Sequence, residues 1–313
     1  MDEPVLAIQD LHKRYGDVIA LDGVDLTVEQ GELIGLLGPN GAGKTTMVSI
    51  ICGLRRADKG RVDVCGVDAL ANPQTARRHI GLAPQELGIY PIDTVRQNLS
   101  LFGELSGLRG GHLRDQIETV AGALRLTKLM DRKAAELSGG QKRRLHTAIA
   151  LLGEPSLILL DEATTGADVE SRAALIDVVK GLAHRGSSVL YSTHYLGEVE
   201  DLGASVVIID HGRVIAEGSV PSLLASNGGS IVELVFDGPP PTLEGRPATS
   251  DDSTLRVSVD DAARSLGPIF SDLGPAVARL QSVEIINPSL ETVFLQLTGR
   301  RYQPEEVLDV MAP

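Results

Sequence analysis

Apolar runs of strand length alternate with helical patterns in the first part of the chain. Residues 32–38 (ELIGLLG) form a short apolar run that ends in glycine, and residues 45–54 place Met, Val, Ile and Leu at helical spacing. Two further apolar runs, residues 156–160 (SLILL) and 188–192 (SVLYS), flank a helical pattern at residues 170–184. Short apolar runs bounded by glycine are typical of buried parallel strands. The pattern therefore predicts an α/β fold.

Two segments of this first part depart from the alternation of strand and helix patterns. Residues 95–153 are rich in Leu, Ala, Arg and Glu and poor in β-branched runs, which predicts a helical subdomain inserted into the α/β core. Residues 205–218 (SVVIIDHGRVIAEG) contain two strand patterns with His211-Gly212 between them, as in a terminal hairpin. We assign residues 1–224 to one domain.

A smaller domain is predicted for residues 225–313. The alternating segments IVELVF and LRVSV, a helix near residues 260–273 and an apolar segment ending in residues 287–298 predict an α+β appendage. Residues 238–241 (GPPP) and 245–253 are predicted to lack regular structure, because glycine, proline and polar residues dominate them.

Composition and charge exclude several classes of protein. Hydrophobic residues make up 42% of the chain, so a sizeable core can form, and the net charge of −13 disfavours a nucleic-acid partner, since phosphate backbones attract basic surfaces. Cys52 and Cys65 lie in no CxxC or Cys/His cluster, so we expect two buried thiols rather than a disulfide or a metal site. No apolar run approaches the ~20 residues that cross a bilayer. We expect a soluble chain whose membrane work is done by another polypeptide.

A phosphate-binding loop lies between the first predicted strand and its helix. Residues 38–46 (GPNGAGKTT) satisfy the pattern G-x-x-x-x-G-K-[ST]. Its glycines let backbone N–H groups curl around phosphates at the positive end of the helix, Lys44 adds a cation, and the Thr45 hydroxyl can bind Mg²⁺. A chance glycine-rich turn is the alternative, which the strand–helix placement disfavours. The predicted loop residues are Gly38, Pro39, Asn40, Gly41, Ala42, Gly43, Lys44, Thr45 and Thr46.

An acidic pair follows the predicted strand at residues 156–160. Phosphoryl transfer to water needs a carboxylate for Mg²⁺ and a group that orients the water. Asp161 at the strand end fits the metal, and Glu162 fits the water as general base. Taken alone, the pair could equally cap the next helix.

Residues 137–141 (LSGGQ) form a second glycine-containing helix start. Ser138 precedes two glycines and a helical pattern, so exposed N–H groups are expected at a second anion-binding surface. The basic run Lys142-Arg143-Arg144 that follows is interpreted as a solvated helix face rather than a phosphate site.

With these motifs, the chain resembles the nucleotide-binding domain of ABC transporters from Val5 to about Leu224. The family's motifs occur in order: Tyr15, the phosphate loop (Walker A), Gln85 (Q-loop), LSGGQ, Asp161-Glu162 (Walker B), Asp168 (D-loop) and the switch His194. The resemblance implies a P-loop NTPase fold, with a RecA-like core and a helical subdomain, that binds ATP and Mg²⁺ and hydrolyses ATP.

The resemblance also implies roles for single residues. Tyr15 would stack on adenine, the alternative being a core aromatic. Gln85 would contact Mg²⁺ or the water, and its loop would contact the membrane partner; His194 would bind the γ-phosphate and hold Glu162. LSGGQ would complete the ATP site of an opposing copy, so a homodimer with two ATP sites is expected. The implied catalytic set is Glu162, His194, Gln85 and Lys44, the metal set is Thr45, Gln85 and Asp161, and the ATP contacts add Tyr15, Ser138, Gly139, Gly140, Gln141 and Asp168 to the phosphate loop.

Two positions depart from the family pattern. Ala163 stands where the family often has Pro, and Ala167 replaces the Leu of the usual Gly-Leu-Asp. Both leave the catalytic atoms in place, so hydrolysis is expected, while Ala167 removes packing at the expected dimer seam.

A segment of the second predicted domain, which we call the tail segment, narrows the kind of ABC ATPase. Residues 287–295 (NPSLETVFL) resemble the PSLEDVFL segment of ATPases paired with ABC-2-type exporters, a group that includes the drug-resistance (daunorubicin-like) branch. The resemblance implies a subunit on the cytoplasmic face of the membrane that powers export of a drug-like or lipophilic compound through a separate permease. Two alternatives are a soluble ABC ATPase acting on ribosomes or nucleic acid, and a scaffold that binds ATP without turnover.

Overall fold

The computed structural model describes residues 3–227, 229–243 and 245–302, which form two compact units. The chain divides between Glu217 and Gly218, whereas the sequence analysis placed the boundary after residue 224. That boundary would cut helix α8 (Val220–Asn227), which lies in the second unit. No described helix is long and apolar enough to span a membrane.

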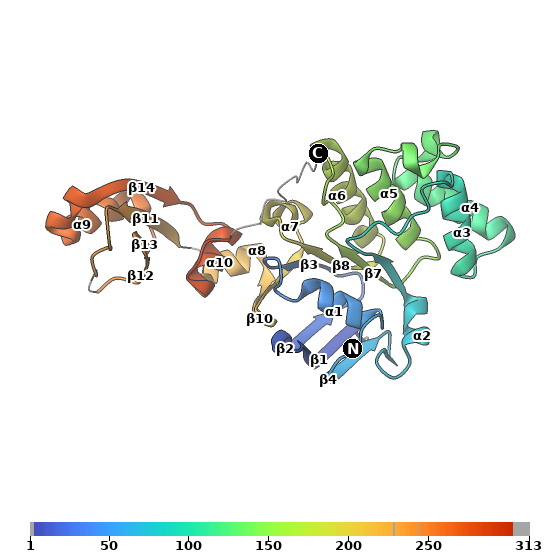
Figure 1. Ribbon diagram of the computed structural model, residues 1–313, viewed down its shortest axis with the longest axis horizontal. Helices are drawn as coiled ribbons and strands as arrows, with labels where there is room; N and C mark the ends of the chain where they lie inside the picture. Colours follow the sequence, from blue (N-terminus) through green and yellow to red (C-terminus); the bar gives the residue numbers. More distant parts are fainter. Residues whose placement is uncertain (1–2, 228, 244, 303–313) are drawn as a thin grey trace. The chain divides into compact units, whose positions relative to one another are not determined.

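A six-stranded sheet forms the core of the first unit, in the order β10-β9-β3-β8-β7-β6 (Figure 1). Neighbours from β9 to β6 pair in parallel, and every residue of β7 and β8 is buried, which explains their nearly continuous apolar sequences. The strands are β3 (Leu33–Leu37), β6 (Ile80–Ala83), β7 (Leu157–Asp161), β8 (Ser188–Thr193), β9 (Ser205–Asp210) and β10 (Arg213–Ser219). The α/β prediction is confirmed, and His211 and Gly212 both have positive φ at the predicted hairpin turn.

The first unit also contains a four-stranded antiparallel sheet, which was not predicted. Its order is β2-β1-β4-β5, formed by β1 (Leu6–Tyr15), β2 (Val18–Val28), β4 (Lys59–Val64) and β5 (Val67–Asp68). Breaks in the β1–β2 register interrupt the strict alternation of apolar and polar residues that marks a strand. Helix α1 (Lys44–Ile51) shares one buried apolar cluster with both sheets: Met47 and Ile50 lie with Leu6 and Leu36.

Helices cover the rest of the first unit (Figure 1). The predicted helical segment contains α3 (Val95–Leu105), α4 (Gly110–Ala123) and α5 (Gly139–Ala150). These helices form one apolar cluster with β7, β8 and the crossover helix α6 (Val169–His184). The short α-helices α2 (Pro73–Ala76) and α7 (Leu196–Leu202) also belong to this unit.

The second unit contains an antiparallel sheet of four strands in the order β12-β13-β11-β14. Its elements are α8, β11 (Ser230–Phe236), β12 (Ala248–Asp251), β13 (Thr254–Val259), α9 (Ala262–Leu273), β14 (Leu280–Ile286) and α10 (Leu290–Thr298). Ile269 and Leu273 of α9 pack in one apolar cluster with β11 and β13. The prediction that residues 245–253 lack regular structure is wrong, because β12 lies there. This polar edge strand carries little apolar signal and is held by backbone pairing with β13.

Candidate functional site

The phosphate loop threads between other segments of backbone, which requires its glycines. A Cβ at Gly38 would lie 2.3 Å from the carbonyl oxygen of Ile209, and one at Gly43 would lie 2.4 Å from that of Ala20. Gly43 is the N-cap of α1 with φ 111°, a conformation that favours glycine, and none of the described side chains caps this helix end. The first N–H groups of α1 are therefore available to an anion.

The side chain of Lys44 is buried against the phosphate loop. Its Nζ donates to the carbonyl oxygens of Gly38 at 2.7 Å and Pro39 at 3.1 Å, and only 4% of its side chain is exposed. Burial lowers the pKa of Lys44, while the charges of Glu162 and Asp161 oppose that shift. The ammonium group is thus held against the backbone of the phosphate loop, at the start of α1.

Asp161 ends β7 directly beside this loop. Its carboxylate accepts a hydrogen bond from the hydroxyl of Ser192. Burial raises the pKa of Asp161, and the hydroxyls of Ser192 and Thr45 oppose the rise. A carboxylate and a loop hydroxyl therefore lie near one another, as a shared Mg²⁺ ligand pair requires.

Polar groups from three other segments of the chain lie close to the Glu162 carboxylate. Its Oε2 accepts from Gln85 Nε2 at 2.9 Å, and its Oε1 lies 3.1 Å from His194 Nδ1 and 4.0 Å from Lys44 Nζ. The backbone of Glu162 has φ 49°, a strained conformation for a residue with a side chain. Burial raises the pKa of Glu162, but the contacts with His194 and the charge of Lys44 outweigh it and leave the pKa below its ordinary value. The carboxylate is therefore ionised and able to accept a proton.

The order of the sheet explains this convergence. Gln85 follows β6, Glu162 follows β7 and His194 follows β8, and these three strands are parallel neighbours. The carboxyl ends of parallel strands lie at one edge, where ligands of such sheets bind. The sequence analysis predicted all three residues but only the sheet order places them together.

The LSGGQ segment forms a separate structure at the start of α5. Ser138 is the N-cap: its Oγ accepts from Gln141 N at 3.3 Å, and its N donates to Gln141 Oε1 at 3.1 Å. Gly140 is packed so closely that a Cβ there would lie 2.5 Å from Ser171 Cβ. Ser138 and Gly139 are exposed. A hollow of about 260 Å³ beside them is lined by Ser138, Gln141, Asp168 and Ser171 together with Arg125 and Arg144, and by no described residue of the phosphate loop.

Asp168 caps a helix, and Tyr15 lies on the surface between two cationic side chains. Asp168 is the N-cap of α6, where its Oδ1 accepts from Ser171 N at 2.8 Å. Tyr15 is 39% exposed, which excludes the core-aromatic alternative, and the cationic groups of Lys13 and Arg55 each lie 5.4 Å from its ring centroid. Tyr15 thus offers a ring face to an aromatic ligand.

The interpretation of Lys142-Arg143-Arg144 as a solvated helix face is wrong for Arg143. Its guanidinium donates to the carbonyl oxygen of Gln85 and, at 3.1 Å, to that of Thr165. Burial lowers the pKa of Arg143, and the nearby Glu162 carboxylate opposes that shift. Because both acceptors are backbone atoms of loops far away in sequence, the charge run carries no signal for this contact.

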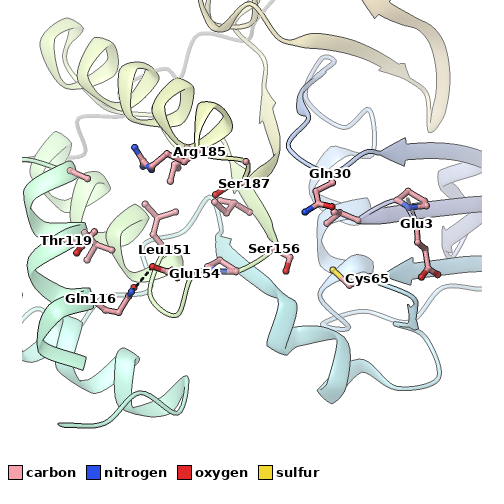
Figure 2. Close-up of a pocket in the computed structure, with 18 residues that line it drawn as sticks. Glu3, Gln30, Cys65, Gln116, Thr119, Leu151, Glu154, Ser156, Arg185 and Ser187 are labelled. Atoms are coloured by element: carbon pink, nitrogen blue, oxygen red, sulfur yellow. Dashed lines mark hydrogen bonds between the residues drawn. The ribbon is translucent and has the colours of Figure 1, made fainter. Parts of the chain in front are cut away.

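A cavity of about 660 Å³ lies at the other end of the sheet (Figure 2). Its lining includes Ser156 and Ser187, which precede β7 and β8, and the hydrogen bond from Gln116 Nε2 to Glu154 Oε1 at 2.8 Å crosses one wall. It therefore opens at the amino ends of strands whose carboxyl ends carry Asp161 and His194. None of the described residues that the sequence analysis assigned to a site lines this cavity.

Known proteins resemble the chain over most of its length. The sequence model of the ABC transporter family matches residues 21–165. The chain is 36% identical to the daunorubicin resistance ATP-binding protein DrrA2 of Streptomyces coeruleorubidus, over 98% of each chain. It is 34% identical to the linearmycin resistance ATP-binding protein LnrL of Bacillus subtilis (95% of this chain, 99% of that one), and 35% identical to the Nod factor export ATP-binding protein I of Burkholderia lata (94% and 97%).

Solved structures of ABC transporter subunits also resemble the chain. An ATP-binding subunit of an ABC transporter covers 71% of this chain and 92% of its own, with a TM-score of 0.65 and 29% identity. A dimeric bacterial ABC transporter cassette covers 68% of this chain and 98% of its own, with a TM-score of 0.63 and 26% identity. A post-hydrolysis form of that cassette with bound ADP and Pi has a TM-score of 0.63 and 25% identity, over 68% and 98%.

Proposed function

The chain belongs to the ABC transporter family, and on this premise we propose that its ATP hydrolysis powers export of a drug-like or lipophilic compound through a separate membrane-spanning subunit. The observation that carries the hydrolytic part is the approach of Gln85, His194 and Lys44 to the Glu162 carboxylate beside the phosphate loop.

Each of these residues has a role in hydrolysis that follows from its surroundings. The N–H groups of the loop and Lys44 Nζ bind the phosphates of ATP. Glu162, whose pKa lies below its ordinary value, accepts the proton of the water that attacks the γ-phosphorus. Gln85 and His194 hold this carboxylate in one orientation, and His194 lies at the strand end from which it can reach the γ-phosphate.

The donor set beside the loop fits Mg²⁺. Thr45 and Asp161 present a hydroxyl and a carboxylate that lie near enough for the hydroxyl to lower the pKa of the carboxylate, and the side-chain oxygen of Gln85 is not used by its Nε2 contact with Glu162. All three are oxygen ligands, which a hard divalent cation prefers. Bound Mg²⁺ would supply charge neutralisation at the β- and γ-phosphates.

We further propose that two copies of the chain bind two ATP molecules between them. The hollow beside Ser138 shares no described lining residue with the phosphate loop, as expected if each supplies one half of an ATP site between two copies. The exposed Ser138 and Gly139 can approach the phosphates held by another copy. The similarity to a dimeric cassette supports this arrangement.

An exposed apolar surface after Gln85 supports contact with the membrane subunit. Leu87, Tyr90 and Ile92 are exposed, Ile92 to 80%, and the Tyr90 ring lies 5.9 Å from that of Phe102 on α3. Contiguous exposed apolar side chains of this kind mark partner surfaces. The chain would then lie against the cytoplasmic face of the membrane.

The class of cargo is proposed from the relatives and from the tail. The names of two relatives refer to resistance to daunorubicin and linearmycin, and that of a third to Nod factor export. In this chain the tail segment forms α10, which Ser289 caps by accepting from Thr292 N. The alternative of an ATPase acting on ribosomes or nucleic acid finds no support among these relatives.

The test is to purify the chain with the membrane subunit and to measure Mg²⁺-dependent ATPase activity with and without candidate compounds. We expect hydrolysis that a drug-like or lipophilic compound stimulates. A complex without any Mg²⁺-dependent hydrolysis would contradict the proposal at its centre, and hydrolysis stimulated by RNA or ribosomes instead would favour the alternative.

A further inference from the structure

A buried carboxylate outside the residues described so far lies directly behind the hydrolytic site. Glu198 on α7 is only 3% exposed. The hydroxyl of Thr164 donates to its Oε1 at 2.5 Å, and the hydroxyls of Thr193 and Tyr191 donate to its Oε2 at 2.7 and 3.0 Å. Arg172 Nε lies 3.3 Å from Oε1. A buried carboxylate is costly unless it is paired and hydrogen-bonded, so its partners define a single position for it.

The partners of Glu198 belong to the segments that carry the hydrolytic residues. Thr164 lies in the turn directly after Glu162, and Thr193 is bonded to His194 in the chain. The Thr193 hydroxyl also accepts from Tyr195 N at 3.0 Å, so the backbone is tied down on both sides of His194.

Arg172 adds the start of α6 to the same network. Its guanidinium lies 4.8 Å from the centroid of the Tyr195 ring, which itself lies 4.2 Å from the ring of His194. Arg172 is on the first turns of the helix that Asp168 caps. One carboxylate thus connects the segment of the base, the segment of the switch histidine and the helix of the D-loop.

We propose that Glu198 is a positioning residue for ATP hydrolysis, which holds His194 and the Glu162 turn in register through the hydroxyls of Thr193 and Thr164. The need for such a support is visible at Glu162, whose positive φ persists only where surrounding structure enforces it. A carboxylate suits this place because it is an acceptor only, and three hydroxyls point at it. Gln would present an N–H₂ group to one or more of those hydroxyls. The inference rests on the proposed roles of Glu162 and His194.

The strand β8 offers a matched pair of substitutions. Thr193 and Ser188 are its last and first residues, and both are buried hydroxyl residues with hydrogen bonds outside the strand. The Thr193 hydroxyl bonds to Glu198, whereas the Ser188 hydroxyl donates to Glu29 O at 3.1 Å and accepts from Gly31 N at 2.9 Å, at the opposite end of the strand. T193V and S188A each remove the two hydrogen bonds of a buried hydroxyl, but only T193V removes one from the network of Glu198.

The experiment measures kcat, KM for ATP, ATP affinity and thermal stability of the full chain carrying E198Q, T193V, both together, S188A or E162Q. We expect E198Q and T193V each to lower kcat about 10- to 100-fold, because small displacements of reacting groups have effects of that size. KM and ATP affinity should stay within about twofold of wild type, as uniform binding is untouched. The double variant should be no slower than E198Q, since both changes break one connection.

Three outcomes would overturn the inference. They are a kcat for E198Q no lower than that of S188A, a loss of kcat matched by loss of ATP affinity, and full additivity of E198Q and T193V. E162Q separates this failure from that of the proposed function. An active E162Q removes the base from the mechanism, whereas an inactive E162Q with a normal E198Q contradicts the positioning role alone.

Discussion

The Nε2 of Gln85 lies 2.9 Å from Oε2 of Glu162, although 77 positions separate the two residues in the chain. Gln85 is exposed and belongs to the segment that also presents Leu87, Tyr90 and Ile92 to solvent. The carboxylate that we propose as the general base is therefore one hydrogen bond away from the proposed surface for the membrane subunit. A movement of that surface would change the orientation of the carboxylate, which is a direct physical route for coupling hydrolysis to transport.

Substitution of the base should separate binding from turnover. We expect E162Q to lower kcat about 10²- to 10⁴-fold, the usual contribution of a general base, while ATP still binds. ATP that is bound but not hydrolysed should hold two copies together, which size-exclusion chromatography with light scattering would detect. Glu154 is a control, since it also has a positive φ (52°) but lies at the far cavity. E154Q should hydrolyse ATP at the wild-type rate, and a monomeric E162Q at saturating ATP would speak against the dimer.

The hydrogen bonds of Arg143 to two backbone carbonyls should be needed for catalysis, whereas the charge of the neighbouring Lys142 should not. R143M removes the donor to the carbonyl oxygens of Gln85 and Thr165, so both loops beside Glu162 lose a support. We expect kcat to fall about tenfold with little change in ATP affinity, because geometry is altered rather than binding. K142M removes the neighbouring charge and should leave kcat unchanged. Equal rates for the two variants would restore the interpretation of this run as a solvated face.

Gly140 should tolerate no side chain. In G140A the new Cβ would lie 2.5 Å from Ser171 Cβ. Ser171 N donates to Asp168, the N-cap of α6. Forced overpacking of this kind typically destabilises by about 1–3 kcal/mol. Urea denaturation would measure this. Gly122, inside α4, has open space around its Cβ position. G122A should therefore be neutral or stabilising, by up to ~1 kcal/mol from helix propensity, and the opposite ranking of the two variants would refute the packing argument.

His146 should make stability depend on pH in the acid range. Burial, aided by the charge of Arg143, lowers the pKa of His146 to about 4. Its Nε2 accepts from Gly88 N at 3.2 Å, which requires the neutral ring. In the unfolded chain the histidine takes up a proton near pH 6.5, whereas the folded chain does so only near 4. The unfolding free energy should fall as pH drops through that window, with a slope of up to about 1.4 kcal/mol per pH unit.

The check on His146 is urea denaturation between pH 7 and 4 of the wild type and H146Q. The variant should be less stable at pH 7 but show a shallower decline, because the titrating group is gone. H112Q, at an exposed histidine of α4, provides the control. A decline in H146Q as steep as that of the wild type would assign the acid sensitivity to other groups.

The sequence by itself determined the parts of this protein whose physics is local. The phosphate loop and its flanking elements are specified without any distant contact. They follow from glycines at positions 38 and 43, from a lysine at the start of the following helix, and from apolar runs of strand length. Ser138 and Gln141 bond to each other across three residues, so their helix start was also visible. The antiparallel sheet of β1, β2, β4 and β5 and the strand β12 were not visible in the sequence. Bulges and polar edge residues interrupt their alternation of apolar and polar positions, and backbone pairing between strands supplies their stability.

Only the tertiary structure decided which residues meet. The neighbouring positions of β6, β7 and β8 bring Gln85, Glu162 and His194 to one sheet edge, and no local pattern gives that order, because helices separate the three strands along the chain. The contacts of Arg143 with backbone carbonyls and of Glu198 with three hydroxyls have the same origin. Among their partners, Gln85 lies 58 positions away in the chain, Thr165 lies 22 away and Thr164 lies 34 away. No local pattern of the sequence predicts a contact across such separations.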